Sequence, residues 1–248
     1  MYTGLEFFES TLQENGVLVL RFNRAPVNAI SLEVKREIIE TFDYISEDPN
    51  VKAVVLTGNG QLFSAGADLK ERQEISPEGG EYRAQNRITR EMFYAIEDCD
   101  TPVIAAIEGA AIGAGIGLAC SSDIQLCSPD SYFLMPEVKV GLAGGASRLA
   151  SLLPPAIAKY PYYGARPVEA PTLEKYGVVL EIVEKSLLVA RAIEIAGEIV
   201  QMDPATVSQA KRTFALTEQM EPRKAYRYEQ GVTLQYARTG RKLVSGKS

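Results

Sequence analysis

The chain has 248 residues, of which 26 are Lys or Arg and 32 are Asp or Glu, and it contains neither histidine nor tryptophan. Without histidine there is no Ser-His-Asp or Cys-His nucleophile system, no imidazole-ligated metal site and no imidazole general base. The composition, 46% hydrophobic and 23% charged, indicates a soluble globular protein, and the net charge of -6 argues against a broad basic face for nucleic acid.

Neither the cysteines nor the apolar segments point to export or to a membrane. Cys99, Cys120 and Cys127 are too few for a disulfide scaffold and lack the paired spacing of a zinc site, so we expect reduced, buried thiols and no metal. Residues 1–6 lack the basic and apolar regions of a signal peptide, which favours a cytoplasmic protein. Glycines and a glutamate interrupt the apolar stretch 103–120, which favours a buried strand, turn and helix over a membrane span.

Predicted strands and helices alternate along the first half of the chain. In chain order, we predict a hairpin of strands 6–12 and 17–23, a helix that Ser31 caps and that runs to about Ser46, a strand at 51–57, a helix from about Gly80 to Glu97, a strand at 103–107, a glycine-rich helix that opens near Ala111, and a strand at 123–127. From about Arg148 the chain is predicted to be mostly helical. Strand–helix–strand order with nearly continuous apolar strands indicates an α/β domain with buried, largely parallel strands.

Two segments with small residues follow predicted strands. In residues 62–69, Leu-Phe-Ser-Ala-Gly-Ala-Asp-Leu, the N–H groups around Ala67 could donate to an anion or a polarised carbonyl. In residues 113–117, Gly-Ala-Gly-Ile-Gly, free N–H groups stand at a predicted helix start. Leu118 occupies the position of the third glycine of a dinucleotide fingerprint, which disfavours a nucleotide-binding module. Tight packing alone is the alternative for both segments.

A third segment, residues 133–142, sets Glu137 among apolar residues directly after Pro136. Burial there would raise the pKa of the carboxyl from about 4.3, as a general acid or base that works near neutrality requires. The alternative is a salt bridge, for which Lys139 is the nearest partner in sequence.

Together the segments form a more specific pattern. Residues 63–69, 101–109, 111–115, 123–124 and 135–137 strongly resemble the enoyl-CoA hydratase/isomerase (crotonase) family, and the likeness extends over roughly residues 5–215. The resemblance implies an α/β crotonase-like fold, in which ββα units wind into a spiral core domain over residues 1–195. A helical C-terminal region over residues 196–248 would then form a homotrimer, or a hexamer made of two trimers.

The resemblance also implies the site. Two backbone N–H groups hold the thioester oxygen in this family while it becomes an enolate, and they fall on Ala67 and Ala114, with Glu137 as the acid/base residue. Coenzyme A enters as part of an acyl-CoA substrate, not as a separate cofactor, and no metal, nucleic acid or membrane partner is implied. The residues expected to bind substrate and CoA are Arg24, Val27, Ala65, Gly66, Asp68, Leu69 and Gly113.

The acid/base residues depart from the pattern of typical hydratases. Those enzymes have a second glutamate a few residues past the glycine run, where this chain has Gly117, which cannot transfer a proton. One glutamate suffices for double-bond isomerisation of an enoyl-CoA, and in some members for hydration or cleavage. We therefore expect isomerisation or single-Glu hydration, with Glu108 in a structural role. The alternatives are a catalytically silent acyl-CoA-binding protein and a hydratase-lyase for another CoA thioester.

Other side chains give weaker signals. Tyr82, Tyr94 and Tyr132 could offer a phenol to the acyl pocket, although core or interface positions are commoner for tyrosine. The basic residues of the tail could meet the CoA phosphates, with a solvated terminus as the alternative. These tail residues are Arg238, Arg241, Lys242 and Lys247.

Overall fold

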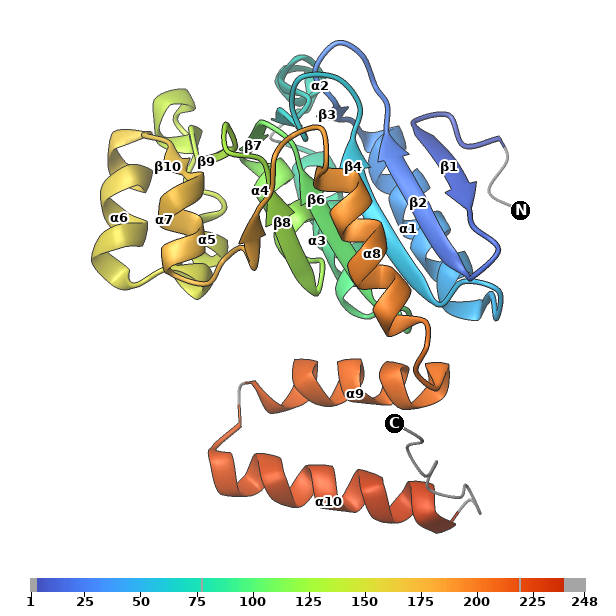
Figure 1. The fold of residues 1–248 in the computed structure, drawn as a ribbon. Helices are drawn as coiled ribbons and strands as arrows, with labels where there is room; N and C mark the ends of the chain where they lie inside the picture. Colours follow the sequence, from blue (N-terminus) through green and yellow to red (C-terminus); the bar gives the residue numbers. More distant parts are fainter. Residues whose placement is uncertain (1–3, 77, 219, 239–248) are drawn as a thin grey trace.

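A six-stranded sheet forms the centre of the protein. Figure 1 shows the computed structural model of the chain, which describes residues 4–76, 78–218 and 220–238. The strands lie in the order β1-β2-β4-β6-β8-β11, and every neighbouring pair is parallel except the hairpin of β1 and β2. The predicted hairpin and the predicted parallel α/β sheet are confirmed. The strands are β1 (Phe8–Leu12), β2 (Val17–Phe22), β4 (Ala53–Gly58), β6 (Val103–Ile107), β8 (Ile124–Cys127) and β11 (Glu181–Ile182).

Helices cover both faces of this sheet. One face packs against α1 (Leu32–Glu47) and α3 (Glu81–Glu97), and α8 (Leu188–Ile199) lies across the other (Figure 1). Every residue of β4 and β6 is buried. Strands covered on both faces need apolar residues at consecutive positions, which explains their continuous hydrophobic runs.

The helices beside the sheet begin where the sequence predicts. The backbone N–H of Val34 donates to the Oγ of Ser31 (3.3 Å), so Ser31 caps α1 as expected. The helix predicted over 80–97 is α3, and Met92 and Ile96 on its apolar face are buried.

Two small sheets extend beyond the main one. They consist of β3 (Ala29–Ile30) with β5 (Gly66–Ala67), and of β7 (Ala110–Ile112), β9 (Tyr132–Leu134) and β10 (Val168–Glu169). The predicted glycine-rich helix is present, but it begins at Ala114 and not near Ala111, because residues 110–112 form β7 and pair with β9. Gly113, at a positive φ of 51°, then turns the chain into α4 (Ala114–Cys120).

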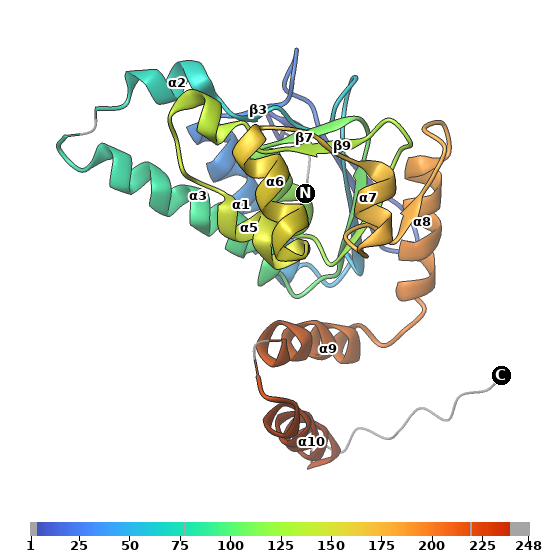
Figure 2. The same cartoon turned by 90° about the vertical axis from the view of Figure 1, so that its left-hand side faces the viewer.

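The last third of the chain is mainly helical, as predicted. Figures 1 and 2 show two helices, α9 and α10, lying apart from the sheet beyond the end of α8. The predicted division after residue 195 falls within α8 and stays a prediction. In the described part of the chain, no helix combines the length and apolar character needed to cross a bilayer. The remaining helices are α2 (Leu69–Glu74), η1 (Glu137–Val140, a 3-10 helix), α5 (Ala146–Leu152), α6 (Pro155–Gly164), α7 (Ala170–Lys175), α9 (Pro204–Thr217) and α10 (Pro222–Arg238).

One buried lysine fastens α9 to the core. The Nζ of Lys211 donates to the backbone carbonyls of Ile96 (3.2 Å) and Thr101 (3.1 Å) and pairs with the carboxylate of Asp123 (2.9 Å). Its neighbour Arg212 pairs with Asp100 at the surface. These contacts join α9 to the end of α3 and to the loop before β8.

Candidate active site

The loop after β4 and the start of α4 meet at the edge of the sheet. The N–H of Asp68 donates to the carbonyl of Ile30 on β3 (3.0 Å). Because successive N–H groups along a strand point to opposite sides, the N–H of Ala67 points away from β3. Ala114 is the first residue of α4, so its N–H has no acceptor within the helix.

Gly66 allows these two backbone segments to approach each other. Its φ is +81°, and a Cβ at this residue would lie 2.3 Å from the carbonyl oxygen of Ile112 and 3.2 Å from the nitrogen of Ala114. The N–H of Ile112 donates to the carbonyl of Ser64 (3.0 Å), which joins the same two segments. The structure thus brings the backbone around Ala67 and Ala114 together, and their role as oxyanion donors stays a prediction.

The carboxylate of Glu137 lies against the same end of α4. A Cβ on Gly113 would be 2.8 Å from its Oε1, and a Cβ on Gly145 would be 3.8 Å from that atom. Its other oxygen, Oε2, is buried and has no hydrogen-bond partner among the described residues. Burial raises the pKa of Glu137, whereas its own backbone N–H and the positive charge of Arg72 act in the opposite direction.

The salt-bridge alternative for Glu137 is not found. Lys139 is exposed, and no ion pair within the described residues includes Glu137. The loop beyond the glutamate is held by Tyr162 of α6, whose hydroxyl donates to the carbonyl of Gly144 (2.8 Å). Sequence reasoning missed Tyr162, because only the fold places α6 beside η1.

An aromatic ring occupies the space beside Gly117. A Cβ on Gly117 would lie 2.4 Å from the Cζ of Phe93 on α3, so the ring leaves no room for a side chain there. The guanidinium of Arg148 stands 5.1 Å from the centre of this ring and pairs with Glu97. The position where typical hydratases have their first glutamate is therefore next to an apolar ring. Gly117 indicated the missing carboxylate in the sequence, but the ring was not predicted.

Of the expected CoA-binding residues, Arg24 and Asp68 bind each other. The Nη2 of Arg24 pairs with Oδ2 of Asp68 (2.9 Å), and its Nη1 donates to the carbonyl of Ala29 (3.0 Å). The carboxylate of Asp68 also caps α2. Although burial raises the pKa of Asp68, its hydrogen bonds to Arg24 and to the backbone of α2 lower it overall. The ion pair joins the segment before β3 to the segment after β5.

The other expected CoA contacts lie around the same loop. The N–H of Ala65 donates to the carbonyl of Val27 (3.0 Å), and the side chains of Val27 and Leu69 are exposed. Exposed apolar side chains suit contact with a ligand, and the binding role of these residues stays a prediction.

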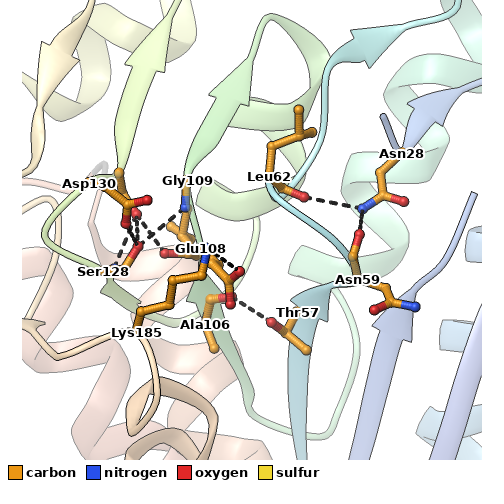
Figure 3. A network of polar contacts seen from close by, with 12 residues as sticks. Asn28, Thr57, Asn59, Leu62, Ala106, Glu108, Gly109, Ser128, Asp130 and Lys185 are labelled. Carbon is orange, nitrogen blue, oxygen red and sulfur yellow. Dashed lines mark hydrogen bonds and ion pairs between the residues drawn. The ribbon is translucent and has the colours of Figure 1, made fainter. Parts of the chain in front are cut away.

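Two further polar residues have structural partners (Figure 3). The Nδ2 of Asn28 donates to the carbonyls of Asn59 (3.0 Å) and Leu62 (3.2 Å) and thereby supports the loop that leads to Ala67. Glu108 pairs with Lys185 (2.8 Å), in agreement with the structural role expected for it.

A small hollow of about 20 Å³ lies beside Ala67, between α1, α2 and α3. Tyr82 lines it, and its hydroxyl accepts a hydrogen bond from Arg72 (2.6 Å). Lys35 also lines it, and burial lowers the pKa of this lysine. Sequence reasoning named Tyr82 and missed both basic residues, which α1 and α2 bring together only in the folded chain.

The remaining candidates lie away from this site or form no special cluster. Tyr94 is exposed, Tyr132 is partly buried in β9, and all three cysteines are free thiols. Burial raises the pKa of Cys120 and Cys127 to about 12, so both stay protonated near neutrality. Arg238 ends α10, whereas Arg241, Lys242 and Lys247 lie outside the described residues. No group of three acidic or cysteine side chains suited to a metal occurs in residues 4–76, 78–218 and 220–238.

Comparisons with known proteins agree on one family. The sequence model of a family described as enoyl-CoA hydratase/isomerase matches residues 12–243. A (7aS)-7a-methyl-1,5-dioxo-2,3,5,6,7,7a-hexahydro-1H-indene-carboxyl-CoA hydrolase of Mycobacterium tuberculosis is 32% identical over 226 residues, 91% of either chain. A carnitinyl-CoA dehydratase of Citrobacter koseri is 32% identical over 217 residues, 86% of this chain and 82% of that protein. The crystal structure of an enoyl-CoA hydratase from Bacillus anthracis has a TM-score of 0.85 at 30% identity, over 91% of this chain and 89% of that chain.

Proposed function

The chain belongs to the enoyl-CoA hydratase/isomerase family, and we propose that it moves the double bond of an enoyl-CoA through a thioester enolate. The observation that carries the proposal is the half-buried Glu137, whose Oε2 has no hydrogen-bond partner among the described residues. It lies beside Gly113 at the start of α4, where the backbone of Gly66 approaches Ala114. A ring, not a second carboxylate, stands beside Gly117. One carboxylate is enough for isomerisation, because the group that removes a proton can return it.

The reaction needs only these groups. The carboxylate of Glu137 removes a proton from C2 of a 3-enoyl-CoA, and the electron pair of that C–H bond forms an enolate whose oxygen accepts hydrogen bonds from Ala67 and Ala114. The protonated Glu137 then donates to C4. The double bond moves from C3–C4 to C2–C3, and no water or other reactant is consumed. Coenzyme A takes part only as the thioester group of the substrate.

The substrate thioester would enter along the loop that leads to Ala67. Ala65, Gly66 and Asp68 flank Ala67 in the chain, Gly113 precedes Ala114, and the two segments approach each other closely at Gly66. The CoA moiety would lie over Val27 and Leu69, whose side chains are exposed, and along Arg24. This part of the proposal is supported by the exposure of Val27 and Leu69 and by their place beside the loop that leads to Ala67.

Assembly into a homotrimer, or into a hexamer of two trimers, is part of the proposal. The support comes from α9 and α10, which expose large apolar side chains: Phe214 at 68%, Tyr226 at 63% and Leu234 at 52%. A chain that buries these residues against other copies would remove a large apolar area from water. Sedimentation of the purified protein tests this part directly, and a monomer at all concentrations contradicts it.

The test of the reaction uses a panel of 2-enoyl-, 3-enoyl- and saturated acyl-CoA thioesters in deuterated water. We expect deuterium at C2 and C4 and conversion between 3-enoyl- and 2-enoyl-CoA. Glu137→Gln should lower turnover at least 100-fold, because the only acid/base group is lost. Glu108→Gln is the matched control, since that glutamate pairs with Lys185 outside the site. Full turnover by Glu137→Gln contradicts the proposal, and binding without label exchange identifies a silent acyl-CoA-binding protein.

A second candidate is hydrolysis of a bicyclic carboxyl-CoA. The hydrolase of Mycobacterium tuberculosis, at 32% identity over 91% of either chain, favours it. The same panel separates the two functions when it includes a bicyclic carboxyl-CoA, because hydrolysis adds the mass of one water and isomerisation leaves the mass unchanged in ordinary water.

A further inference from the structure

Phe93 and Glu137 both lie beside the first turn of α4. Gly113 is the residue before α4, at a positive φ, and its carbonyl accepts a hydrogen bond from the N–H of Gly117 (3.4 Å), so the two glycines bound the first turn of α4. Gly113 meets the carboxylate of Glu137, and Gly117 meets the ring of Phe93. Gly145, whose carbonyl accepts from the N–H of Arg148, also borders the carboxylate, and Arg148 lies over the ring, so the ring and the carboxylate flank the same turn of the chain. The acyl carbons beyond the reacting ones would extend beside the ring.

The ring is held firmly in this place. The guanidinium of Arg148 lies 5.1 Å from its centre, a cation–π arrangement. Arg148 also pairs with Glu97, and Glu97 accepts a hydrogen bond from the Oγ of Ser121 at the end of α4 (2.9 Å). Phe93 is only partly buried, so part of its surface remains accessible while α3, α4 and α5 fix the rest.

We propose that Phe93 is a specificity-determining residue, which restricts the reaction to isomerisation and the substrate to enoyl-CoA thioesters with an apolar acyl chain. This inference rests on the proposed function. Hydration would join a water oxygen to C3, pass a water proton to a base and place a proton on C2. A phenyl ring offers no base for that water, and it occupies the space in which a side chain at position 117 would begin. The protonated Glu137 is then the proton donor that meets the enolate.

With the ring in this position, residue 117 has room only for glycine. Any Cβ there would overlap the ring, which it would approach to 2.4 Å. Gly117 and Phe93 thus form a pair in which the large residue on α3 requires the small residue on α4. A side chain at position 117 therefore requires a smaller residue, or a displaced ring, at position 93.

The first experiment removes the ring. Phe93→Ala and Phe93→Leu are compared with the wild type and with Tyr94→Ala, a control on the next, exposed residue of the same helix. Each protein receives 3-hexenoyl-CoA or 2-hexenoyl-CoA in water enriched in oxygen-18. We expect Phe93→Ala to raise the ratio of hydration to isomerisation about tenfold or more. Phe93→Leu, which keeps part of the apolar volume, should give a smaller shift in the same direction, and Tyr94→Ala should give none.

The second experiment restores a carboxylate. In Phe93→Ala/Gly117→Glu the removal of the ring makes space for the new glutamate side chain. A correctly positioned general base raises the rate of a reaction by about 10²–10⁴. We therefore expect at least a tenfold further gain in oxygen-18 incorporation over Phe93→Ala. A folded Phe93→Ala with the wild-type product ratio overturns the inference. Should that variant not fold, an unchanged ratio in Phe93→Leu overturns it. A wild type that exchanges no label with any acyl-CoA overturns the proposed function as well, whereas a wild type that turns over with an unaltered variant ratio overturns this inference alone.

Discussion

Replacement of Gly66 by alanine tests whether the two backbone segments form an oxyanion site. The new Cβ would lie 2.3 Å from the carbonyl oxygen of Ile112, whereas real Cβ contacts are essentially never under 3.0 Å. Loop and helix must therefore separate by at least about 0.7 Å, and a misplacement near 1 Å can cost about 100-fold in rate. Loss of one oxyanion donor costs about 2.7–4 kcal/mol, or about 10²–10³ in kcat. Gly66→Ala should thus lower kcat about 100-fold or more.

The assay separates this effect from ordinary strain. Gly177 also has a positive φ, +70°, but a Cβ there would meet nothing within 4 Å. Gly177→Ala should therefore lose about 1–2 kcal/mol of stability, a fall in Tm of about 2–8 °C, and keep its turnover. Turnover is followed by conversion of 3-enoyl-CoA to 2-enoyl-CoA, and Tm by thermal unfolding. The reasoning is refuted if Gly66→Ala is folded and retains more than about a third of the wild-type kcat.

Further outcomes are expected from the same structure. Because the folded-state pKa of Glu137 is raised, kcat/KM should rise with pH through a midpoint above about 4.3, and a midpoint at or below that value contradicts the assignment. The buried charge of Glu137 opposes folding at a pH above that pKa, so Glu137→Gln should have the same Tm as the wild type or a higher one at pH 8, and this difference should vanish by about pH 4. The reasoning is contradicted if the Tm of the variant, relative to that of the wild type, is lower at pH 8 than at pH 4. Gly117→Ala should lose about 1–3 kcal/mol through overlap with Phe93, and Phe93→Ala should relieve that loss in a double-mutant cycle of unfolding free energies. Lys211→Met should cost about 1–3 kcal/mol, because Asp123 and two backbone carbonyls lose their partner, and amide hydrogen exchange should show faster exchange in α9; unchanged protection there speaks against the anchor.

Local patterns predicted the parts of the fold that depend on neighbouring residues. The run at 103–107 is apolar at every position because helices cover both faces of its strand, and its bounds match β6. Ser31 was recognised as a cap because its Oγ serves an N–H only three residues away. The strand at 110–112 was missed because its partner, β9, lies about twenty residues further along and no local signal records that pairing.

The same distinction applies to the site. Glu137 and the glycines around Ala67 and Ala114 could be recognised as motifs, because two backbone segments can approach closely only where the residues between them are small. Phe93 was placed only on a predicted helix, and nothing in its own segment indicated that it faces Gly117, which is 24 positions away in the numbering. Arg24 and Asp68 were both predicted to bind CoA, and the structure shows an ion pair between them that the sequence did not indicate.

The anchor at Lys211 makes the C-terminal helices costly to remove. A chain cut before α9 would keep the main sheet and the helices on both of its faces, so all the elements of the α/β core would be present. It would also leave the carbonyls of Ile96 and Thr101 without their donor and Asp123 without its cation. Ile96 lies one turn after Phe93 on α3, so a shortened chain would loosen the helix that carries the ring beside the site. Any minimal version of this enzyme must therefore either keep α9 or redesign the end of α3.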